Sequence, residues 1–306
     1  MEQKTAIGID LGGTNIKGIL LNKEGTIIYQ AVRHTSDTGN GSAAKGNWKK
    51  EVASLVEEIA AVPSGNTENI GLSAPGLPSE HNDCIAFMPG RLPGLENFIW
   101  ADYLQKQKVW VLNDSMAALM AEASFGAAKE LSNVILLTLG TGVGGGILIN
   151  GKIYQGYYQM AGHLGHISVS AGTDDPDIVG IPGSLEQAIG NETVSYRTCG
   201  KYTDTSELVK DYLKQDTFAT YVWLTSVRKL SLAICSFCNA ISPEAIIIGG
   251  GIAKAGEALF KPLNDFIDLY EWRPAGKRTI IKQAAFSEYA GAVGAAAYAL
   301  QNNISK

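Results

Sequence analysis

Two histidines stand three residues apart in the segment QMAGHLGHIS, which covers residues 159–168. His163 and His166 could together bind a metal ion, transfer a proton or hold a substrate. A metal site needs about four ligands. The acidic side chains that follow, Asp174, Asp175 and Asp177, lie in a polar loop, where hydration explains them more simply. The residues alone leave all three chemistries open.

Two glycine-rich turns each follow directly on a predicted buried strand: DLGGT at 10–14 and LGTGVGGG at 139–146. Glycine lets the backbone approach a ligand and point N–H groups at an anion, and threonine adds a hydroxyl donor. One such turn is equally well explained as a tight hairpin. Two equivalent turns that face each other across a cleft could hold a polyphosphate. A third cluster, IIIGGGIAKAGE at 246–257, could carry a nucleotide's base or ribose.

Asp10 and Asp114 are carboxylates at the ends of two predicted strands. Beside bound phosphates, Asp10 needs a cation, and Mg²⁺ held directly or through water fits. Asp114 stands where a strand passes into a helix, and an N-cap would explain it without chemistry. Its position between the two turns also suits a base that takes a hydroxyl proton while that oxygen attacks a phosphoryl group. The adjacent Asn113 could hold a neighbouring hydroxyl.

These residues belong to a unit that occurs twice. AIGIDLGGTNIKGILLNKEGTIIYQ, residues 6–30, and VILLTLGTGVGGGILINGKIYQ, residues 134–155, each predict three strands joined by a Gly/Thr turn and a polar glycine turn. A recurrence about half a chain apart indicates a duplicated domain.

Strands and helices alternate after each unit. Apolar patterns predict strands in NIGLSAP, VWVLND and EAIIIGGG and an extended segment over 278–284. Helices are predicted over 49–61, 115–128, 217–241, 256–270 and 288–301. This alternation is typical of a three-layer α/β architecture in two lobes, with a ligand cleft between them.

Composition excludes several classes of protein. The chain has 306 residues, 45% hydrophobic and 18% charged, which is typical of a globular protein of two domains. A net charge of -5 disfavours a nucleic-acid surface. No apolar run is long enough to cross a membrane, and MEQKTAIGID lacks a signal-peptide core, so we expect a cytoplasmic protein with reduced cysteines. Cys235 and Cys238 lie in an apolar run and are expected as core residues of a buried helix.

Together these motifs resemble those of the ROK family of sugar kinases and repressors, in the actin-like ATPase superfamily, over nearly the whole chain. IGIDLGGTNIKG and LTLGTGVGGGILINGKIYQG resemble the two phosphate motifs, and GLSAPG resembles the sugar-side loop. LNDSMAALMAE resembles the segment with the catalytic aspartate, GHISV the G-H motif and GGGIA the adenosine-side turn. The resemblance implies two duplicated, ribonuclease H-like lobes with a cleft between them. The lobes would be 1–113 plus 289–306, and 114–288, and the small residues of YAGAVGAAAYAL would let the last helix pack closely on the first lobe.

The resemblance also implies ATP-dependent phosphorylation of a hydroxyl on a hexose or hexose derivative, by a homodimer. Asp114 would be the general base, and Asp10 would position Mg²⁺, directly or through water. The nucleotide side would consist of Gly12, Gly13, Thr14, Gly140, Thr141, Gly142, Gly250 and Gly251. The sugar side would consist of Asn113, His163, His166, Glu186, Arg91, Pro75 and Gly76. From the residues alone, Glu186 is also explained as a first-turn acid of a helix with Ser184 and Gln187 as its capping box.

The chain departs from the family pattern at three places. Many members follow the G-H motif with a C-x-C-G-x-x-G-C-x-E zinc cluster, but HISVSAGTDDPDIVGIPGSLEQ contains no cysteine, so we predict no structural zinc. His163 replaces the glutamate of the family's E-x-G-H motif. In a loop that often reads N-L-P-G-W, Arg91 replaces the asparagine and Leu95 the tryptophan. These changes favour both histidines lining a donor-rich sugar pocket, ahead of a core pair or a metal site. An N-acyl, acidic or phosphorylated sugar would suit that pocket better than glucose.

Three functions other than a sugar kinase are alternatives. A ROK repressor would carry a helix-turn-helix before the first phosphate motif, which here begins within the first ten residues. A catalytically degenerate member would act as a sugar-binding or regulatory module; the lost E-x-G-H glutamate suits it, and retention of Asp10 and Asp114 opposes it. A phosphatase or acyl-CoA-type ATPase of the same superfamily would lack the sugar-side motifs. The predicted partners are a sugar and ATP, with no nucleic acid and no membrane.

Overall fold

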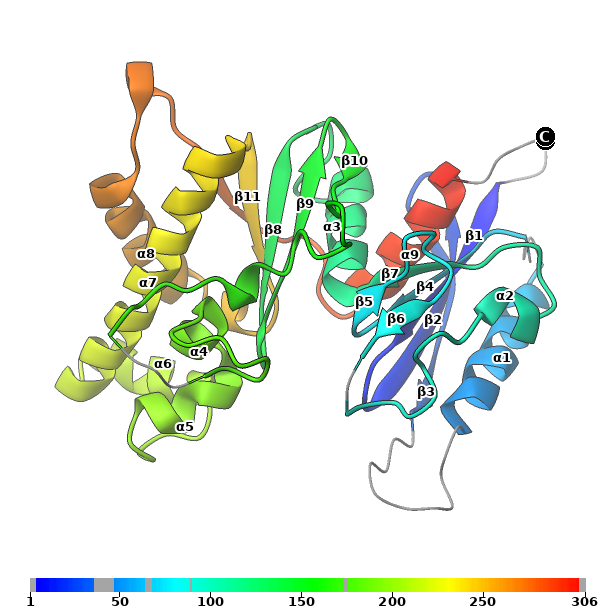
Figure 1. Ribbon diagram of the computed structural model, residues 1–306, viewed down its shortest axis with the longest axis horizontal. Helices are drawn as coiled ribbons and strands as arrows, with labels where there is room; N and C mark the ends of the chain where they lie inside the picture. Colours follow the sequence, from blue (N-terminus) through cyan, green and yellow to red (C-terminus); the bar gives the residue numbers. More distant parts are fainter. Residues whose placement is uncertain (1–3, 36–46, 64–67, 89, 173–175, 303–306) are drawn as a thin grey trace. The chain divides into compact units, whose positions relative to one another are not determined.

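A computed structural model of the chain describes residues 4–35, 47–63, 68–88, 90–172 and 176–302 (Figure 1). The chain divides into two compact units, each described by itself below. The first consists of Met1–Glu130, Gln155–Met160 and Phe286–Lys306, and the second of Leu131–Tyr154 and Ala161–Ala285. This division puts the helix that begins at Asp114 in the first unit, whereas the family resemblance starts the second lobe at that residue. The expected cleft between the lobes stays a prediction.

A five-stranded sheet forms the centre of the first unit, in the order β3-β2-β1-β4-β7. Its strands are β1 (Thr5–Leu11), β2 (Asn15–Asn22), β3 (Ile27–His34), β4 (Ile70–Ala74) and β7 (Trp110–Asn113). The first three strands form an antiparallel meander, and β4 and β7 continue the sheet parallel to β1. The carboxyl ends of β1, β4 and β7 therefore lie at one edge of the sheet.

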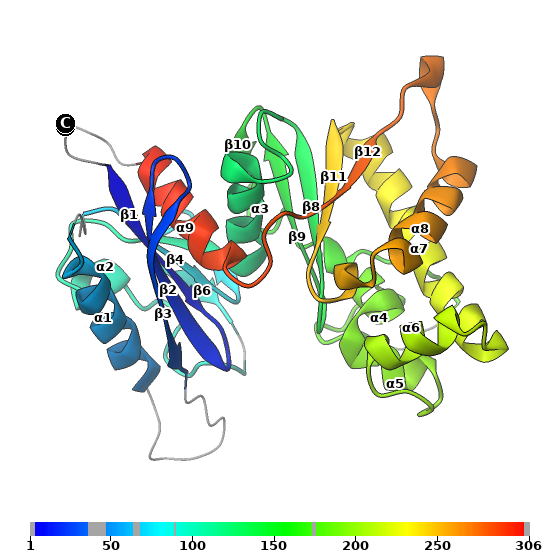
Figure 2. The same cartoon turned by 180° about the vertical axis from the view of Figure 1, so that it is seen from behind.

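Helices cover both faces of this sheet because the side chains of β1 alternate. Ile7, Ile9 and Leu11 are buried in the cluster that includes α1 (Asn47–Ala60) and α2 (Trp100–Tyr103). Ala6 is buried in the cluster of the opposite face, with α3 (Asp114–Phe125) and α9 (Ala290–Asn302). Figure 2 shows α1 and α9 on opposite sides of the strands. Asp10 is four residues after Ala6 in β1, so its side chain points to the same face of the sheet, the one that α9 covers.

Close packing of α9 depends on small residues, as its composition predicts. A Cβ atom at Gly71 of β4 would overlap the backbone carbonyl of Ala295, and one at Gly294 would overlap that of Ala117 in α3. The last helix can therefore lie directly against the backbone of both neighbours.

The sheet of the second unit repeats this pattern, in the order β10-β9-β8-β11-β12. Its strands are β8 (Val134–Leu139), β9 (Val143–Ile149), β10 (Lys152–Ile153), β11 (Ala245–Gly249) and β12 (Ile280–Gln283). Pairing is antiparallel from β8 to β10, and β11 and β12 extend the sheet in parallel. The predicted duplication is therefore confirmed, since each strand corresponds to one of the first sheet.

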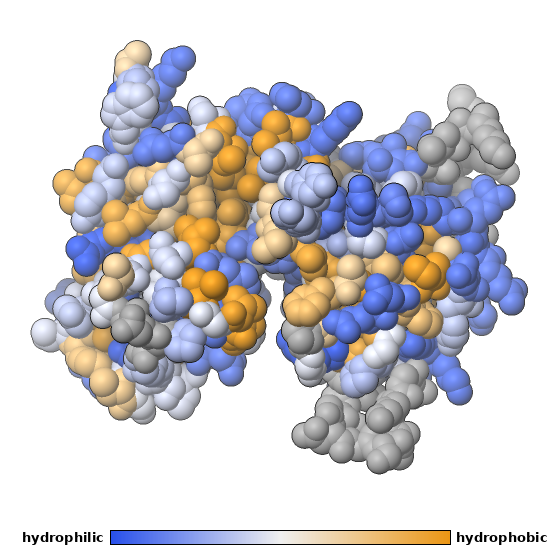
Figure 3. All heavy atoms as spheres, in the orientation of Figure 1, coloured by the Kyte–Doolittle hydropathy of each residue, from blue (hydrophilic) through white to orange (hydrophobic). Residues whose placement is uncertain are grey.

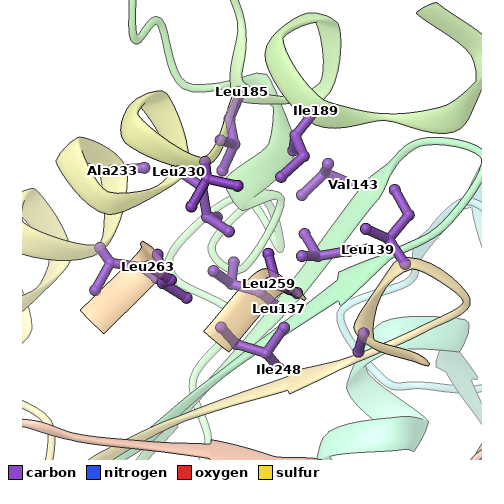
Figure 4. Packing of buried hydrophobic residues seen from close by; sticks show 14 of the residues in the cluster. Leu137, Leu139, Val143, Leu185, Ile189, Leu230, Ala233, Ile248, Leu259 and Leu263 are labelled. Atoms are coloured by element: carbon purple, nitrogen blue, oxygen red, sulfur yellow. The ribbon is translucent and has the colours of Figure 1, made fainter. Parts of the chain in front are cut away.

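The second unit contains nine helical segments within the described residues. They are η1 (Leu164–His166), α4 (Leu185–Ile189), η2 (Asn191–Thr193), α5 (Val194–Arg197), α6 (Thr205–Leu213), α7 (Thr217–Ile241), η3 (Ile252–Ala255), α8 (Glu257–Tyr270) and η4 (Pro274–Gly276). All but η2 and η4 contribute to one core with the sheet. Figure 4 shows side chains of α4, α7 and α8 pointing towards those of β8 and β11, all in one buried cluster.

Most predicted elements occur where the sequence indicates them, and α7 has the predicted bounds. Short elements were not predicted: the hairpin of β5 (Leu77–Pro78) and β6 (Ile85–Phe87), and α2, α5 and α6; α4 occurs where the capping-box alternative for Glu186 places a helix. Cys235 lies buried on α7 and Cys238 is partly buried there, and all four cysteines are free thiols. Burial raises the pKa of Cys235 to about 11, so its thiol is protonated and behaves as a core residue, as expected.

The visible surface of the protein carries both hydrophilic and hydrophobic side chains. On the face drawn in Figure 3, hydrophilic side chains are spread over both units between smaller hydrophobic areas. Within the described ranges, no helix has the length and apolar character needed to span a membrane.

Candidate active site

Three strand ends bring distant residues of the first unit together. The register of β1 and β4 sets Asp10 beside Ser73, and that of β4 and β7 sets Ala74 beside Asn113. Because the three strands are parallel, the segments after them all leave the sheet at the same edge. Ligands of open α/β sheets bind outside this edge.

Asp10 is held in a polar niche under α9. Ser73 donates a hydrogen bond from Oγ to the Oδ1 atom of Asp10 at 3.0 Å. A Cβ atom at Gly291, in the first turn of α9, would lie 2.5 Å from the same oxygen. Burial raises the pKa of Asp10 to about 6; the Ser73 hydrogen bond lowers it, the charge of Asp114 raises it, and that of Lys17 lowers it. A cation bound nearby would stabilise the ionised form of a carboxylate in such surroundings.

The first Gly/Thr turn is tied to the body of the unit through its carbonyl groups. Gly12 donates its N–H to the carbonyl of Asn15 at 3.0 Å, and its own carbonyl accepts from Thr35 Oγ1 at 2.7 Å. The carbonyl of Thr14 accepts from the Thr35 N–H at 2.9 Å. A side chain at Gly13, between them, would have to displace the end of the Arg91 side chain.

Arg91 occupies the space beside Gly13. A Cβ atom at Gly13 would lie 2.6 Å from the Nη2 atom of Arg91. The structure thus brings the guanidinium, which the sequence analysis assigns to the sugar side, next to the first phosphate turn.

The helix cap at the end of β7 is Asn113, not Asp114. Asn113 has extended backbone angles, and its Oδ1 atom accepts from the Ser115 N–H at 2.9 Å. Asp114 is the first residue of α3, is exposed, and accepts from the same N–H at 2.7 Å. The expected alternative, that Asp114 serves as the cap, is therefore wrong, because its neighbour already fills that position.

Asn113 also connects the strand end to the sugar-side loop. Its Nδ2 atom donates to the carbonyl of Gly76 at 2.9 Å, so both polar atoms of the amide are engaged. Gly76 has a φ of 108°, and a Cβ there would lie 2.7 Å from the carbonyl oxygen of Phe87. Glycine is required at this turn, and the half-buried Pro75 precedes it.

The second Gly/Thr turn joins β8 to β9 in the second unit. The carbonyls of Gly140 and Thr141 accept hydrogen bonds from the N–H groups of Asn191 and Glu192, both at 2.9 Å. These bonds turn the carbonyls of the turn towards the protein. Space around Gly140 is open, since a Cβ atom there would meet no neighbour within 4 Å.

The third glycine cluster lies beside the second turn. Gly249 of β11 pairs with Thr138 of β8, and the next residue, Gly250, has a φ of 87°. A Cβ at Gly250 would overlap the carbonyl of Leu139, whereas one at Gly251 would meet nothing within 4 Å. The predicted phosphate and adenosine turns of this unit are thus adjacent.

Glu186 lies on α4 and reaches the second turn. Its Oε2 atom accepts from the N–H of Val143 at 2.9 Å. Ser184 is the predicted cap and accepts from the N–H of Gln187 at 3.1 Å. The reciprocal bond of the predicted capping box differs, because Gln187 accepts from the N–H of Gly183, one residue before the cap, at 3.2 Å. The neighbours of Glu186, Leu185 and Ile189, are anchored in the core with Leu139 and Val143 (Figure 4).

His163 precedes the short helix η1, and His166 is its last residue. The carbonyl of His163 accepts from the N–H of His166 at 3.3 Å, and the Nε2 atom of His163 is buried. His166 Nδ1 lies 3.0 Å from the Oδ2 atom of Asp177. Asp177 was expected to be hydrated, but its side chain is only 1% exposed. This expectation was wrong because the N–H groups of Val179 and Ile181 and the ring of His166 contact the carboxylate and bury it. The other two acids of the polar loop, 174 and 175, lie outside the described residues.

The predicted site residues therefore form two groups. The first unit brings together Asp10, Gly12, Gly13, Thr14, Pro75, Gly76, Arg91, Asn113 and Asp114. The second unit holds Gly140, Thr141, Gly142, His163, His166, Glu186, Gly250 and Gly251. Sequence reasoning missed Ser73 and Asp177. Ser73 lies inside the quoted GLSAPG motif, which was a usable signal, but nothing in the sequence separates Asp177 from the other acids of its loop.

Comparison with known proteins agrees with this geometry. The family model described as "ROK family" matches residues 6–302. A glucokinase of Halalkalibacterium halodurans is 30% identical over 96% of this chain and 94% of its own. A xylose repressor of Bacillus subtilis is 30% identical over 54% of this chain and 42% of its own. The crystal structure of a ROK hexokinase from Thermus thermophilus superimposes with a TM-score of 0.84 at 26% identity, over 96% of this chain and 97% of that one.

The match spans nearly all of the chain and includes both glycine turns, the Asn–Asp pair that begins α3 and the G-H segment at η1. The fold is the actin-like ATPase fold of sugar kinases with similar structures. The chain belongs to the ROK family.

Proposed function

We propose that this protein is a ROK sugar kinase that transfers the γ-phosphoryl group of Mg-ATP to a hydroxyl of a hexose or hexose derivative, with Asp114 as general base. The observation that carries the proposal is that Asp10, near the end of β1, and Asp114, directly after β7, lie at one edge of the first sheet, where the charge of Asp114 raises the pKa of Asp10. One carboxylate is buried beside a glycine turn and the other is exposed at a helix start. This difference suits a metal-side acid and a proton acceptor.

The glycine turns support ATP as the phosphoryl donor. Gly140 leaves open space where a side chain would otherwise stand, and Arg91 approaches Gly13 closely. Backbone N–H groups and a guanidinium are the usual partners of phosphate oxygens. Gly250 and Gly251, beside the second turn, would accept the adenosine. The position of Arg91 suggests that it acts on the phosphates in addition to its expected sugar-side role.

Asp10 fits a role in holding Mg²⁺. Its carboxylate supplies hard oxygen ligands, and burial disfavours its charge in the absence of a cation. Direct and water-mediated binding both suit a single carboxylate. When bound with ATP, Mg²⁺ would neutralise charge that develops on the transferred phosphoryl group.

Asp114 would remove the proton of the attacking hydroxyl. Its backbone is fixed as the first residue of α3, and the N–H of Ser115 holds one carboxylate oxygen at 2.7 Å. The remaining lone pairs can accept the hydroxyl proton as the oxygen attacks phosphorus. Asn113 would orient a neighbouring sugar hydroxyl, and its bond to the Gly76 carbonyl fixes the loop with Pro75 against the same ligand.

Residues of the second unit support a proposal for the substrate class. His163 stands where other family members carry a glutamate, so a neutral or cationic ring replaces an anionic acceptor. With His166 and Glu186 on the same side, the pocket would offer both donors and acceptors. We therefore expect an N-acyl, acidic or phosphorylated sugar to be preferred over glucose.

The test is ADP release over a panel of hexoses, N-acetylhexosamines, and acidic and phosphorylated sugars, with wild type and Asp114→Asn side by side. The variant should lose about 10²–10⁴-fold in kcat while its sugar affinity stays near wild type. Asp204→Asn, which retains an N-cap residue on α6, is a matched control and should keep full activity.

Wild-type kcat in Asp114→Asn would show that another group is the base. If no sugar supports turnover but one raises the melting temperature, the protein is a sugar-binding or regulatory module instead. Glucose as clearly the best substrate would contradict the proposed specificity while leaving the kinase activity intact.

A further inference from the structure

Asp177 is the centre of a small closed loop in the second unit. Its Oδ1 atom accepts from the N–H groups of Val179 at 3.0 Å and Ile181 at 2.9 Å. Its Oδ2 atom lies 3.0 Å from Nδ1 of His166. The side chain of Asp177 is 1% exposed, whereas that of His166 is 27% exposed. Both oxygens of the Asp177 carboxylate therefore have partners within the protein, while part of the imidazole ring of His166 is exposed.

The loop is anchored to the segment that follows His166. The N–H of Val169 donates to the carbonyl of Gly183 at 2.8 Å, and Ser168 donates from Oγ to the carbonyl of Pro182 at 3.0 Å. The N–H of Leu185 donates to the carbonyl of Ile167 at 2.9 Å. A continuous hydrogen-bonded ladder therefore connects η1, which ends at His166, to α4, which carries Glu186.

We propose that Asp177 is a positioning residue, which fixes the ring of His166 with its Nδ1–H towards the carboxylate and its Nε2 atom as acceptor for a sugar hydroxyl. This inference rests on the proposed function for the identity of the ligand. The segment from His166 to Glu186 contains no cysteine, so a thiolate-bound metal cannot organise it. In place of a metal, the buried carboxylate of Asp177 holds this segment through its bonds to backbone N–H groups and to His166.

The hydrogen-bond inventory determines the tautomer. Burial by itself would raise the pKa of Asp177, but hydrogen bonds from the Ile181 backbone, His166, Ser184 and the Val179 backbone outweigh it and lower that pKa. The group is therefore a carboxylate near neutral pH and can only accept. Nδ1 of His166 must then carry a hydrogen. In the neutral ring this leaves a lone pair on Nε2, as in other Asp–His pairs.

A metal ion is the competing explanation for the same cluster. Among the described residues, one ligand atom each from His166, Asp177 and Glu186 lie within 4.8 Å of one another. However, both oxygens of Asp177 already have partners, and Oε2 of Glu186 accepts from the N–H of Val143. A cation would compete with these bonds, so the structure favours the hydrogen-bonded arrangement.

The experiment combines NMR of the histidine side chains with kinetics. Long-range ¹H–¹⁵N spectra of the full-length protein show which ring nitrogen carries the hydrogen, with signals assigned from His163→Gln and His166→Gln. Wild type should have His166 as the Nδ1–H tautomer. In Asp177→Asn, the side-chain amide can donate to Nδ1, and the hydrogen should move to Nε2.

The same variant should raise KM for the sugar about tenfold, because Nε2 changes from acceptor to donor, and leave KM for ATP unchanged. Asp204→Asn is the control for loss of a carboxylate that accepts a backbone N–H, and should change neither value.

Three results would overturn the proposal: an Nε2–H tautomer in wild type, an unchanged sugar KM in Asp177→Asn, or stoichiometric zinc in the wild type that Asp177→Asn loses. If Asp177→Asn does not fold, the wild-type tautomer still decides. The kinase function is tested by a different readout, ADP release by wild type. If ADP release is absent while His166 has the expected tautomer, the proposed function fails and the positioning role of Asp177 does not.

Discussion

Glu186 accepts a hydrogen bond from the backbone N–H of Val143, the first residue of β9, within the second glycine-rich segment. A Cβ atom at Gly142 would overlap that same carboxylate. A residue expected to bind sugar hydroxyls is therefore in direct contact with a turn expected to bind phosphate. Through this contact, a change in the turn moves a group on the sugar side.

Gly142→Ala and Gly140→Ala should therefore differ in which substrate's KM they change. Alanine at Gly142 displaces Glu186 and should raise KM for both ATP and the sugar, each by about tenfold. Alanine at Gly140 meets no protein atom within 4 Å, so it should obstruct only the bound nucleotide and raise KM for ATP alone. Steady-state kinetics with each substrate varied in turn makes the comparison. Equal effects of the two variants on the sugar KM would contradict the coupling.

Asp10 should make the magnesium-free protein less stable as the pH rises from about 4 to about 6. Its folded pKa is raised from 3.8 to about 6, mainly by burial, so in this window the folded state binds more protons than the unfolded state. Asp10→Asn has no such charge, so its stability should not fall over this range. Above pH 6, the difference in unfolding free energy between the variant and wild type should therefore exceed the difference at pH 4 by at most roughly 3 kcal/mol, in favour of the variant. Thermal unfolding in a chelator at pH 4 and pH 7 measures this. A difference between the proteins that is the same at both pH values would show that the buried charge does not matter.

Arg91 should act mainly on the nucleotide. Because its guanidinium lies beside Gly13, Arg91→Gln should raise KM for ATP about tenfold and change KM for the sugar less, while Arg91→Lys should restore part of the loss. Initial rates over ATP and sugar concentrations separate the two constants. A larger effect on the sugar constant would assign Arg91 to the sugar side, as the family resemblance alone implies.

Gly294→Ala should destabilise the first unit. The added methyl group would overlap the carbonyl of Ala117 and push α9 away from α3, at a cost of about 1–3 kcal/mol. Gly251→Ala adds the same methyl group where no atom lies within 4 Å, and should leave stability unchanged. Denaturant unfolding of both variants tests the pair, and an equal midpoint for the two would show that α9 is not closely packed.

Strand patterns and glycine turns predicted most of the fold. The internal repeat was readable because both copies keep the same alternation of strands and turns, and the structure bears out the repeated strand order. Short elements such as α2 and α5, with four residues each, were missed because they contain too few residues to show a period.

The site was less predictable than the fold, because much of it depends on contacts between distant segments. Asp114 is a plausible cap by residue type, and only the backbone of Asn113 shows that the cap lies one residue earlier. Asp177 resembles any loop acid in the sequence, and its burial arises from the fold of 177–181 around it. The approach of Arg91 to Gly13 joins positions far apart along the chain, which no local pattern reports.

The placement of α9 has a consequence for how the protein is made. β1 and the helix that covers one of its faces are separated in the chain by the whole second unit. As a ribosome synthesises the chain from the N-terminus, the part of that face covered by α9 stays exposed although α3 is already made, while the second unit can complete its own core from sequence already made. We expect the second unit to fold first during translation. Ribosome-bound chains that carry residues 1–285 followed by an unrelated linker long enough to fill the exit tunnel should therefore protect the second unit from protease but leave the first sensitive.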